Sequence, residues 1–119
     1  MQKRLRLRKR EDFSRVFKHG RAAANHQLVV YYKPSSDAAS FRLGISVSKK
    51  IGNAVVRNMM RRRLKEIVRH MEERIAKRVD IVLIVRKPAV ELQHPELKRS
   101  VQHVFKRAGL LTGAFRQDR

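Results

Sequence analysis

The sequence predicts a single α+β domain in which helices pack against a β-sheet. The chain has 119 residues, 42% of them hydrophobic, which is enough for one domain with a buried core. Alternation of apolar and polar residues from Phe41 to Ser48 indicates a half-buried strand. A helical apolar stripe over residues 54–76 follows, and then a nearly continuous apolar run from Val79 to Val85. This order of strand, long helix and strand predicts a βαβ-like unit.

The chain begins with a basic arm, residues 1–10, whose apolar contacts are Leu5 and Leu7. Such a segment is either a solvated, mobile arm or an arm that orders on a phosphate backbone, and both interpretations stay open here. A short helix is expected from about Asp12 to His19. Asp12 is its predicted N-cap, and Gly20 is expected to end it. Its apolar face, at i, i+3 and i+4 spacing, consists of Phe13, Val16 and Phe17.

Two strands are expected before the long helix. The first runs from about Gln27 to Lys33, is rich in β-branched and aromatic residues, and ends at the Pro34–Asp37 turn. The second, Phe41 to Ser48, has one apolar face and one open face of small and basic residues. The apolar face holds Phe41, Leu43, Ile45 and Val47, and the open face holds Arg42, Gly44, Ser46 and Ser48. Small residues on the open face let another backbone approach closely.

The long helix is expected from about Ala54 to Ala76, with Asn53 as its N-cap. Its core stripe consists of Met60, Leu64, Ile67, Val68, Met71 and Ile75. At about 100° per residue, an adjacent flank carries Asn58, Arg61, Arg62, Lys65 and Arg69. Arg57 lies at the border between stripe and flank, so the helix can pack through one side and bind through another.

After the long helix, the apolar run from Val79 to Val85 suits an interior strand, parallel to a neighbour. A hydrogen-bonded structural role is favoured for Asp80 within it. The last helix should start near Pro95 and end at Gly109. Its stripe consists of Leu97, Val101, Val104, Phe105 and Ala108, and the tail after about residue 111 is expected to be frayed.

The charge of the chain points to a polyanionic partner. Lys and Arg number 30 against 10 Asp and Glu, which gives a formal charge of +20. Such a field attracts nucleic acid, with an anionic membrane surface as the weaker alternative. Between Arg57 and Arg69 the only acid is Glu66, whereas solvated surface helices mix signs. Lys49 and Lys50 precede the helix N-terminus, whose free N–H groups favour a phosphate.

Several other classes of function are disfavoured. The chain has no cysteine, so disulfides and thiolate metal sites are excluded. No apolar run approaches the roughly 20 residues that span a bilayer, and the basic N-terminus lacks the apolar segment of a secretory signal, so a cytoplasmic location is expected. The five histidines show no metal-ligand spacing, and the few acids argue against a metal-dependent nuclease centre in the polypeptide.

The aromatic residues allow two interpretations. Phe13 and Phe17 are spaced as core residues, yet they lie in the most basic third of the chain. Stacking of a base on an exposed ring contributes about 1–3 kcal/mol. Tyr31 and Tyr32 point to opposite faces of their strand, so at most one of them lines an open face. Core packing and an aromatic-lined RNA cleft both remain possible from spacing alone.

Three segments, FSRVFKHG, GISVSKKIGNAVVRNMMRRRLKEIVR and IVLIVRKPA, resemble the protein subunit of bacterial ribonuclease P. The resemblance covers about residues 3–108. It implies an enzyme whose catalytic subunit is RNA, which removes the 5′ leader of precursor tRNA with Mg²⁺ held mainly by that RNA. The implied partners are the RNA subunit and the precursor tRNA, with no protein partner and no membrane. The implied fold is a two-layer domain with a mixed, mainly antiparallel sheet and a left-handed βαβ crossover.

The resemblance also implies two sets of site residues. The family's leader-binding cleft corresponds to Phe13, Phe17, Tyr31, Ser46 and Ser48. The surface for the catalytic RNA corresponds to Lys49, Lys50, Asn53, Arg57, Asn58, Arg61, Arg62, Lys65 and Arg69. No catalytic or metal-binding residue is implied in the protein itself.

One position departs from the family pattern. Met59 stands where the family usually has an arginine, and it is expected to be exposed, opposite the core stripe. Either that contact is dispensable or Arg63 supplies the charge. Two other functions remain as alternatives: an RNA-binding module of the ribosome or its assembly, and a stand-alone nuclease, which the shortage of acids disfavours.

Overall fold

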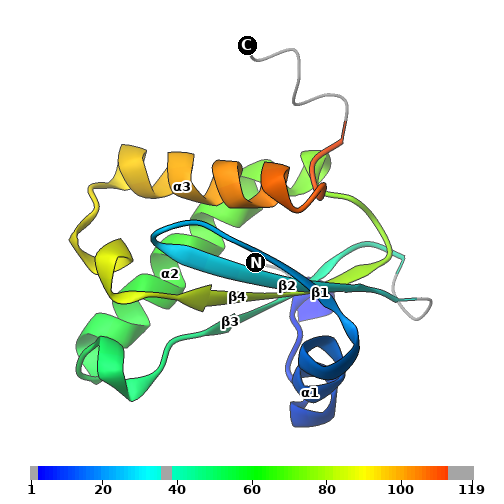
Figure 1. Cartoon of the computed structure of the whole chain (residues 1–119), viewed down its shortest axis with the longest axis horizontal. Coiled ribbons are helices and arrows are strands. Elements are labelled where there is room, and N and C mark those ends of the chain that lie inside the picture. Colours follow the sequence, from blue (N-terminus) through cyan, green and yellow to red (C-terminus); the bar gives the residue numbers. More distant parts are fainter. Residues whose placement is uncertain (1–2, 36–38, 113–119) are drawn as a thin grey trace.

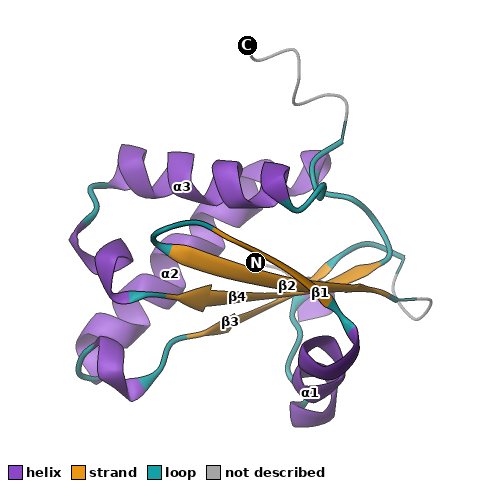
Figure 2. Cartoon of the chain, viewed as in Figure 1, coloured by secondary structure: helices purple, strands orange, loops and turns teal. Residues whose placement is uncertain are grey.

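The computed structural model describes residues 3–35 and 39–112 (Figure 1). Within these residues the main helices are α1 (Arg10–His19), α2 (Ala54–Met71) and α3 (His94–Arg107). The strands are β1 (Arg21–Ala24), β2 (Leu28–Pro34), β3 (Arg42–Ser46) and β4 (Val79–Val85), as Figure 2 shows in orange. Short 3₁₀ turns lie at Lys3–Leu5, Lys49–Ile51, Glu72–Arg74 and Lys87–Glu91. The α+β class predicted from the sequence is confirmed.

The four strands form one mixed sheet in the order β1-β2-β4-β3. The β1–β2 and β2–β4 pairs are antiparallel, and β3 and β4 are parallel, with Leu43 opposite Ile81 and Ile45 opposite Leu83. Helix α2 connects the two parallel strands. In Figure 1 both strands run from right to left, α2 crosses on the α3 side, and β4 is nearer the viewer than β3. The crossover is therefore left-handed, against the usual preference.

The two faces of the sheet carry separate hydrophobic clusters. On the face covered by α2 and α3, Phe41, Met60, Leu64, Ile81 and Phe105 are at most 1% exposed. On the other face, α1 packs through Val16 on Val82 and joins Leu7 in a smaller cluster. The smaller cluster covers only part of its face, so the sheet has one closed side and one partly open side.

Alternation along the strands explains which side each residue faces. The four apolar residues predicted for one side of the second strand all pack in the larger cluster, although β3 itself is shorter than predicted. On the other side, Arg42 donates two hydrogen bonds of 2.8 Å to the carboxylate of Asp80. Because Asp80 is buried, this pairing satisfies its charge and confirms the structural role predicted for it.

The structure corrects three of the elements expected from the sequence. Helix α1 starts at Arg10, so the predicted N-cap Asp12 lies inside the first turn, where it accepts a hydrogen bond from Arg15. Strand β1, with the sequence RAAA, was not predicted, because alanine and arginine carry no strand signal and pairing with β2 decides its conformation. Helix α2 ends at Met71 rather than near residue 76, and a 3₁₀ turn follows it.

The predicted helix caps are partly confirmed. The Asn53 side chain accepts a hydrogen bond from the Val56 N–H at 3.0 Å, as an N-cap should. Helix α3 has Pro95 in its first turn and a capping box between Gln93 and Glu96, which was not predicted. Gly109 follows α3 with a φ of 75°, the left-handed conformation expected of a glycine stop.

The N-terminal arm is part of the fold in its described residues. Leu5 and Leu7 are 2% and 4% exposed and enter different clusters, one on each face of the sheet. Arg6 forms a parallel bridge with Leu43, and the Leu7 N–H donates to the Leu43 carbonyl at 2.9 Å. The interpretation of a solvated, mobile arm is therefore wrong for these residues, which extend the sheet beside β3.

The start of the predicted frayed tail is also ordered. Leu111 forms an antiparallel bridge with Ile75, and the Thr112 N–H donates to the Arg74 carbonyl at 2.7 Å. The rest of that expected tail, residues 113–119, lies outside the described residues. No helix among the described residues is both long enough and apolar enough to cross a membrane.

Candidate nucleic-acid interface

The segment from β3 to α2 places cations around a helix N-terminus. Strand β3 ends at Ser46, and the 3₁₀ turn Lys49–Ile51 and Gly52 lead to the Asn53 cap. Lys49 and Lys50 are exposed beside the first turn of α2. The first N–H groups of a helix carry a partial positive charge, so this end of α2 favours an anion together with both lysines.

The predicted basic flank of α2 is present beside its buried stripe. Met60, Leu64, Ile67, Val68 and Met71 are buried, as predicted. Asn58, Arg62 and Arg69 are exposed, while Arg57, Arg61 and Lys65 are half-buried, so their charged ends lie above packed aliphatic stems. The Nε of Arg57 is buried and has no hydrogen-bond partner among the described residues. An unpaired buried donor in the first turns of a basic helix suits an acceptor from outside the protein.

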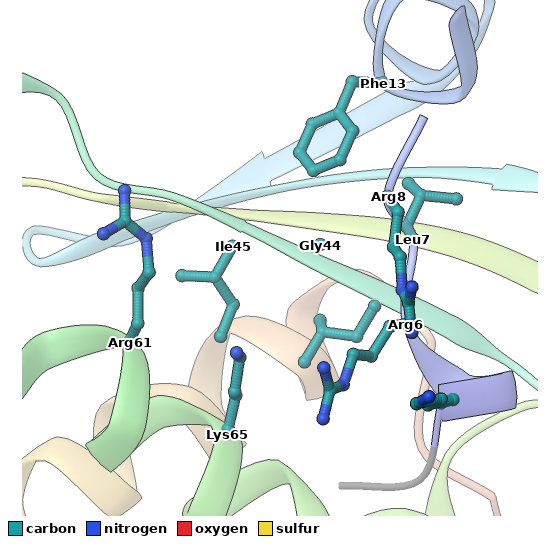
Figure 3. Close-up of a pocket in the computed structure, with 10 residues that line it drawn as sticks. Arg6, Leu7, Arg8, Phe13, Gly44, Ile45, Arg61 and Lys65 are labelled. Atoms are coloured by element: carbon teal, nitrogen blue, oxygen red, sulfur yellow. The ribbon is translucent and has the colours of Figure 1, made fainter. Parts of the chain in front are cut away.

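A pocket of about 520 Å³ lies at the β3 edge, between α2, the N-terminal arm and α1 (Figure 3). It is called the junction pocket here. Its lining contains five cations and no acid: Lys3, Arg6, Arg8, Arg61 and Lys65. Figure 3 shows Arg61 and Lys65 rising from α2, and Arg6 and Arg8 coming from the N-terminal arm. The remaining lining residues are Leu7, Phe13, Leu43, Gly44 and Ile45.

The electrostatics of the junction pocket favour an anion. Burial lowers the pKa of the Lys65 ammonium, and the neighbouring charges of Arg6 and Arg61 lower it further. The protein thus holds like charges close together at a cost to the protonated lysine. A phosphate between them would relieve this repulsion and raise the pKa of the Lys65 ammonium.

At the C-terminal end of the basic flank of α2, the cation is paired with an acid. Arg69 forms an ion pair with Glu66 at 2.6 Å, and His70 Nε2 lies 3.0 Å from the same carboxylate oxygen. These two hydrogen bonds lower the pKa of Glu66 to about 2, so the carboxylate stays ionised. Arg69 is therefore partly neutralised within the protein. Of the flank residues assigned to RNA binding, it is the one whose charge is already paired among the described residues.

The structure bears on one of the two explanations offered for Met59, the replacement of the missing charge by Arg63. Arg63 does not stand in for the missing charge, because its guanidinium donates to the Leu92 carbonyl at 2.8 Å and lies 3.9 Å from the Met60 sulfur. Arg63 thus fixes the segment before α3 to α2. Met59 is 37% exposed, as predicted, next to the largely exposed Val55.

A row of aromatic rings lies between α1 and the open part of the sheet. The Phe13 ring covers Gly44, where a Cβ atom would come within 2.3 Å of the ring, so a larger residue there would displace the ring. Phe17 and Tyr31 meet edge to face, with ring centroids 5.0 Å apart and an interplanar angle of 86°. Phe17 is 40% exposed, whereas Phe13 and Tyr31 are half-buried.

The predicted cleft residues therefore play unequal parts. Phe13 is largely a packing residue, and Phe17 offers an open ring face beside Tyr31. Ser46 is half-buried at the end of β3 and Ser48 is exposed beyond it, so both continue the open face toward Lys49. The open side of β3 is narrower than predicted, because Phe13 covers Gly44 and Asp80 pairs with Arg42.

Sequence reasoning missed the contribution of the arm to this interface. Lys3, Arg6 and Arg8 were expected on a segment of undecided order, and the structure makes them one wall of the junction pocket. The signal that could have found them is the alternation of Leu5 and Leu7 with basic residues, which is a strand pattern.

The described side chains do not form a metal centre. Among residues 3–35 and 39–112, no group of three or more His, Asp or Glu could hold an ion. The junction pocket presents cations and apolar groups, which do not fit Mg²⁺, because that ion prefers carboxylate and other oxygen ligands.

Comparison with known proteins identifies the family. The family model described as Ribonuclease P matches residues 1–109. The chain belongs to the ribonuclease P protein family. A ribonuclease P protein component from Bacillus cereus strain B4264 is 44% identical over 110 residues, which are 92% of this chain and 96% of the relative. The relative from Bacillus anthracis strain CDC 684 is also 44% identical, with 92% of each chain covered.

Solved structures agree with this assignment. The ribonuclease P protein of Staphylococcus aureus matches with a TM-score of 0.85 and 40% identity, covering 91% of this chain and 98% of that one. The ribonuclease P protein of Thermotoga maritima matches with a TM-score of 0.79 and 34% identity, covering 86% and 96%. The chain is thus a protein component of a tRNA-processing ribonucleoprotein, ribonuclease P, and its partner is the RNA subunit of that enzyme.

Proposed function

We propose that the chain binds the catalytic RNA of ribonuclease P through α2 and the 5′ leader of precursor tRNA through the aromatic row on α1 and β2. In this role it promotes the Mg²⁺-dependent cleavage that gives the mature tRNA 5′ end. The RNA subunit carries out the chemistry. The observation that carries the proposal is the junction pocket, where Phe13 of α1 meets Arg61 and Lys65 of α2.

Because residues of α1 and α2 line the same pocket, one small protein can bind two RNAs next to each other. A single-stranded leader that lies along Phe17 and Tyr31 reaches the β3 edge near Phe13. There the cations of α2 and of the arm face the same space. The leader and the catalytic RNA are both polyanions, so they repel each other where they approach. Five cations at that point reduce the repulsion and lower the Mg²⁺ concentration needed to bring the two RNAs together.

Sequence-tolerant binding of the leader follows from the same residues. The open ring of Phe17 offers a stacking face to any base, and the exposed cations contact the backbone, which is the same in every sequence. Carboxylates are absent from the junction pocket lining, so we place Mg²⁺ on the RNA. No step of this proposal runs through a protein-bound ion.

The experiment is reconstitution with the RNA subunit. Precursor tRNA cleavage is measured at low Mg²⁺, with and without the chain, on substrates that carry leaders of one and of eight nucleotides. The chain should increase cleavage of both, and the increase should be larger for the longer leader, which can reach the aromatic row. An equal increase in cleavage for both substrates would contradict leader binding by the chain. No increase for either substrate would contradict the whole proposal.

A role in the ribosome or its assembly makes the opposite prediction. The chain would then sediment stably with ribosomal subunits and leave leader cleavage unchanged. No feature of the described residues favours this role over the proposed one.

A further inference from the structure

A second basic pocket lies at the other end of the sheet. It has a volume of about 560 Å³ and is bounded by the end of α1, the start of β1, the end of β2, the segment before β4 and the end of α3. It is called the distal pocket here. Its lining contains three cations, Arg21, Lys77 and Arg78, together with His19, and no acid. Tyr32 forms part of its wall.

The distal pocket is separate from the interface proposed for the leader and the catalytic RNA. Phe13 lines the junction pocket and His19 the distal one, six residues or roughly 9 Å apart along α1. Tyr31, of the aromatic row, and Tyr32, of the distal pocket, point to opposite faces of β2. The lining of the two pockets has no residue in common.

Arg78, which lines the distal pocket, has a strained backbone conformation. Arg78 has a φ of 59°, the only positive value at a non-glycine residue in the part of the chain that the structure describes. Glycine or asparagine adopts this conformation at lower cost than a long side chain does. Two hydrogen bonds hold it: the Arg78 N–H donates to the Ser40 carbonyl at 3.1 Å, and the Ser35 N–H donates to the Arg78 carbonyl at 2.8 Å. A long charged side chain on a residue in this strained conformation points to a functional role for the guanidinium.

The charges around the pocket are available to a ligand. His19, Arg21, Lys77 and Arg78 are exposed, and none of them takes part in an ion pair among residues 3–35 and 39–112. The partial negative charge at the C-terminus of α3 is opposed by Lys106 and Arg107 in its last turn, and two of its last carbonyls already accept backbone hydrogen bonds. Leu110 N–H donates to the Phe105 carbonyl and Gly109 N–H to the Lys106 carbonyl, each at 3.0 Å.

We propose that the distal pocket is a second binding site for single-stranded RNA, outside the leader cleft. Its size suits a nucleotide rather than a lone ion, its three cations Arg21, Lys77 and Arg78 suit phosphodiester groups, and Tyr32 supplies an aromatic edge at the wall. A concave pocket of this kind does not suit a flat anionic membrane. The site contacts the backbone, so it favours RNA without a preferred sequence.

The test uses the full chain alone, with an unstructured oligonucleotide, octauridylate, as the probe. Backbone amide shifts are followed by NMR during titration. In the native chain, the amides of Arg21, Lys77, Gly109 and Leu110 should move, together with those near Phe17. Movement confined to the amides near Phe17 and Tyr31 would overturn the proposal. An octaglutamate peptide is titrated in parallel, and equal shifts with that peptide would also overturn it, because the site would then be a general polyanion surface.

Arg78→Gly separates binding from folding. Glycine accepts a positive φ, so this variant should unfold at an unchanged or higher urea concentration while losing the guanidinium. Combined with Arg21→Gln, it should weaken octauridylate binding about three- to tenfold. It should remove the amide shifts at Lys77 and Gly109 and keep those near Phe17.

Lys98→Gln with Arg99→Gln is the charge-matched control for the double variant, because both residues are exposed on α3 and lie outside both pockets. It should leave the amide shifts unchanged. Native affinity in the Arg21→Gln/Arg78→Gly variant would contradict the proposal. Because the measurement needs neither the RNA subunit nor tRNA, its result is independent of the reconstitution experiment.

Discussion

At the residue scale, neighbouring side chains of the site differ in whether they pack in the protein or are exposed to a ligand. Phe13 and Phe17 share one helix face, yet Phe13 covers Gly44 whereas Phe17 is 40% exposed. Arg63 and Arg62 are neighbours, yet the first is tied to the Leu92 carbonyl and the second is exposed. The spacing of residues along a helix predicts which residues share a face. It does not predict how far the sheet beneath that face extends.

Phe17→Ala should reduce the preference of the holoenzyme for leader-bearing over mature tRNA by about fivefold or more, since base stacking contributes about 1–3 kcal/mol. The ring is partly exposed, so the free energy of unfolding should change little. The measurement compares dissociation constants of the two tRNAs. Phe17→Tyr is the control, because it keeps a stacking face. A large loss of stability with an unchanged preference would show that Phe17 is a core residue.

At the element scale, α2 combines three functions in separate strips. One strip is buried in the core, one carries the half-buried cations of the junction pocket, and one pairs Glu66 with Arg69 and His70. The Asn53 cap fixes where the helix begins and therefore where each strip points. Because all three strips lie on one rigid helix, its core contacts also position its charges.

Replacing Arg61 and Lys65 together by glutamine should weaken binding to the RNA subunit and flatten its salt dependence. If both contact phosphates of a duplex, the log–log slope should shrink by about 1.8, or roughly 0.9 for each lost contact. Glutamine keeps part of the aliphatic stem that packs on the helix, which limits the effect on folding.

The matched control for this pair is Lys98→Gln with Arg99→Gln, two exposed cations on α3. It removes the same charge and should leave the slope nearly unchanged. Equal slopes for the two double variants would mean that RNA responds to net charge rather than to the junction pocket.

At the scale of the whole molecule, the N-terminal arm connects the hydrophobic clusters on the two faces of the sheet at the β3 edge. Leu5 packs in the cluster beneath α2 and α3, and Leu7 packs with Val16 of α1 and Val82 on the opposite face. The arm also forms one wall of the junction pocket. Its order is therefore coupled to both the fold and the interface.

Leu5→Ala and Leu7→Ala form a matched pair that tests this coupling. Each removes a buried leucine, so each should lower the free energy of unfolding by about 2–4 kcal/mol, measured by urea denaturation. Only Leu7 lines the junction pocket beside Phe13. At a temperature where both variants are folded, Leu7→Ala should therefore lose more leader-dependent affinity than Leu5→Ala. The same loss in both variants would show that stability alone controls binding.

Much of this protein follows from the sequence by itself. The period-2 pattern around Leu43 and Ile45, the helical stripe of α2 and the Asn53 cap are local properties, because they depend on residues within a few positions of each other. The charge of +20 and the nearly unopposed cations of α2 predict a polyanionic partner in the same direct way.

Only the tertiary structure decided how these parts meet. The strand RAAA becomes β1 because β2 offers it a partner, and the arm is ordered because Leu43 pairs with it. The junction pocket needs three segments far apart in the chain, and its residues carry no common local pattern. Such contacts depend on strand order and on the hand of the crossover, which arise from packing of the whole chain and not from its local periodicity.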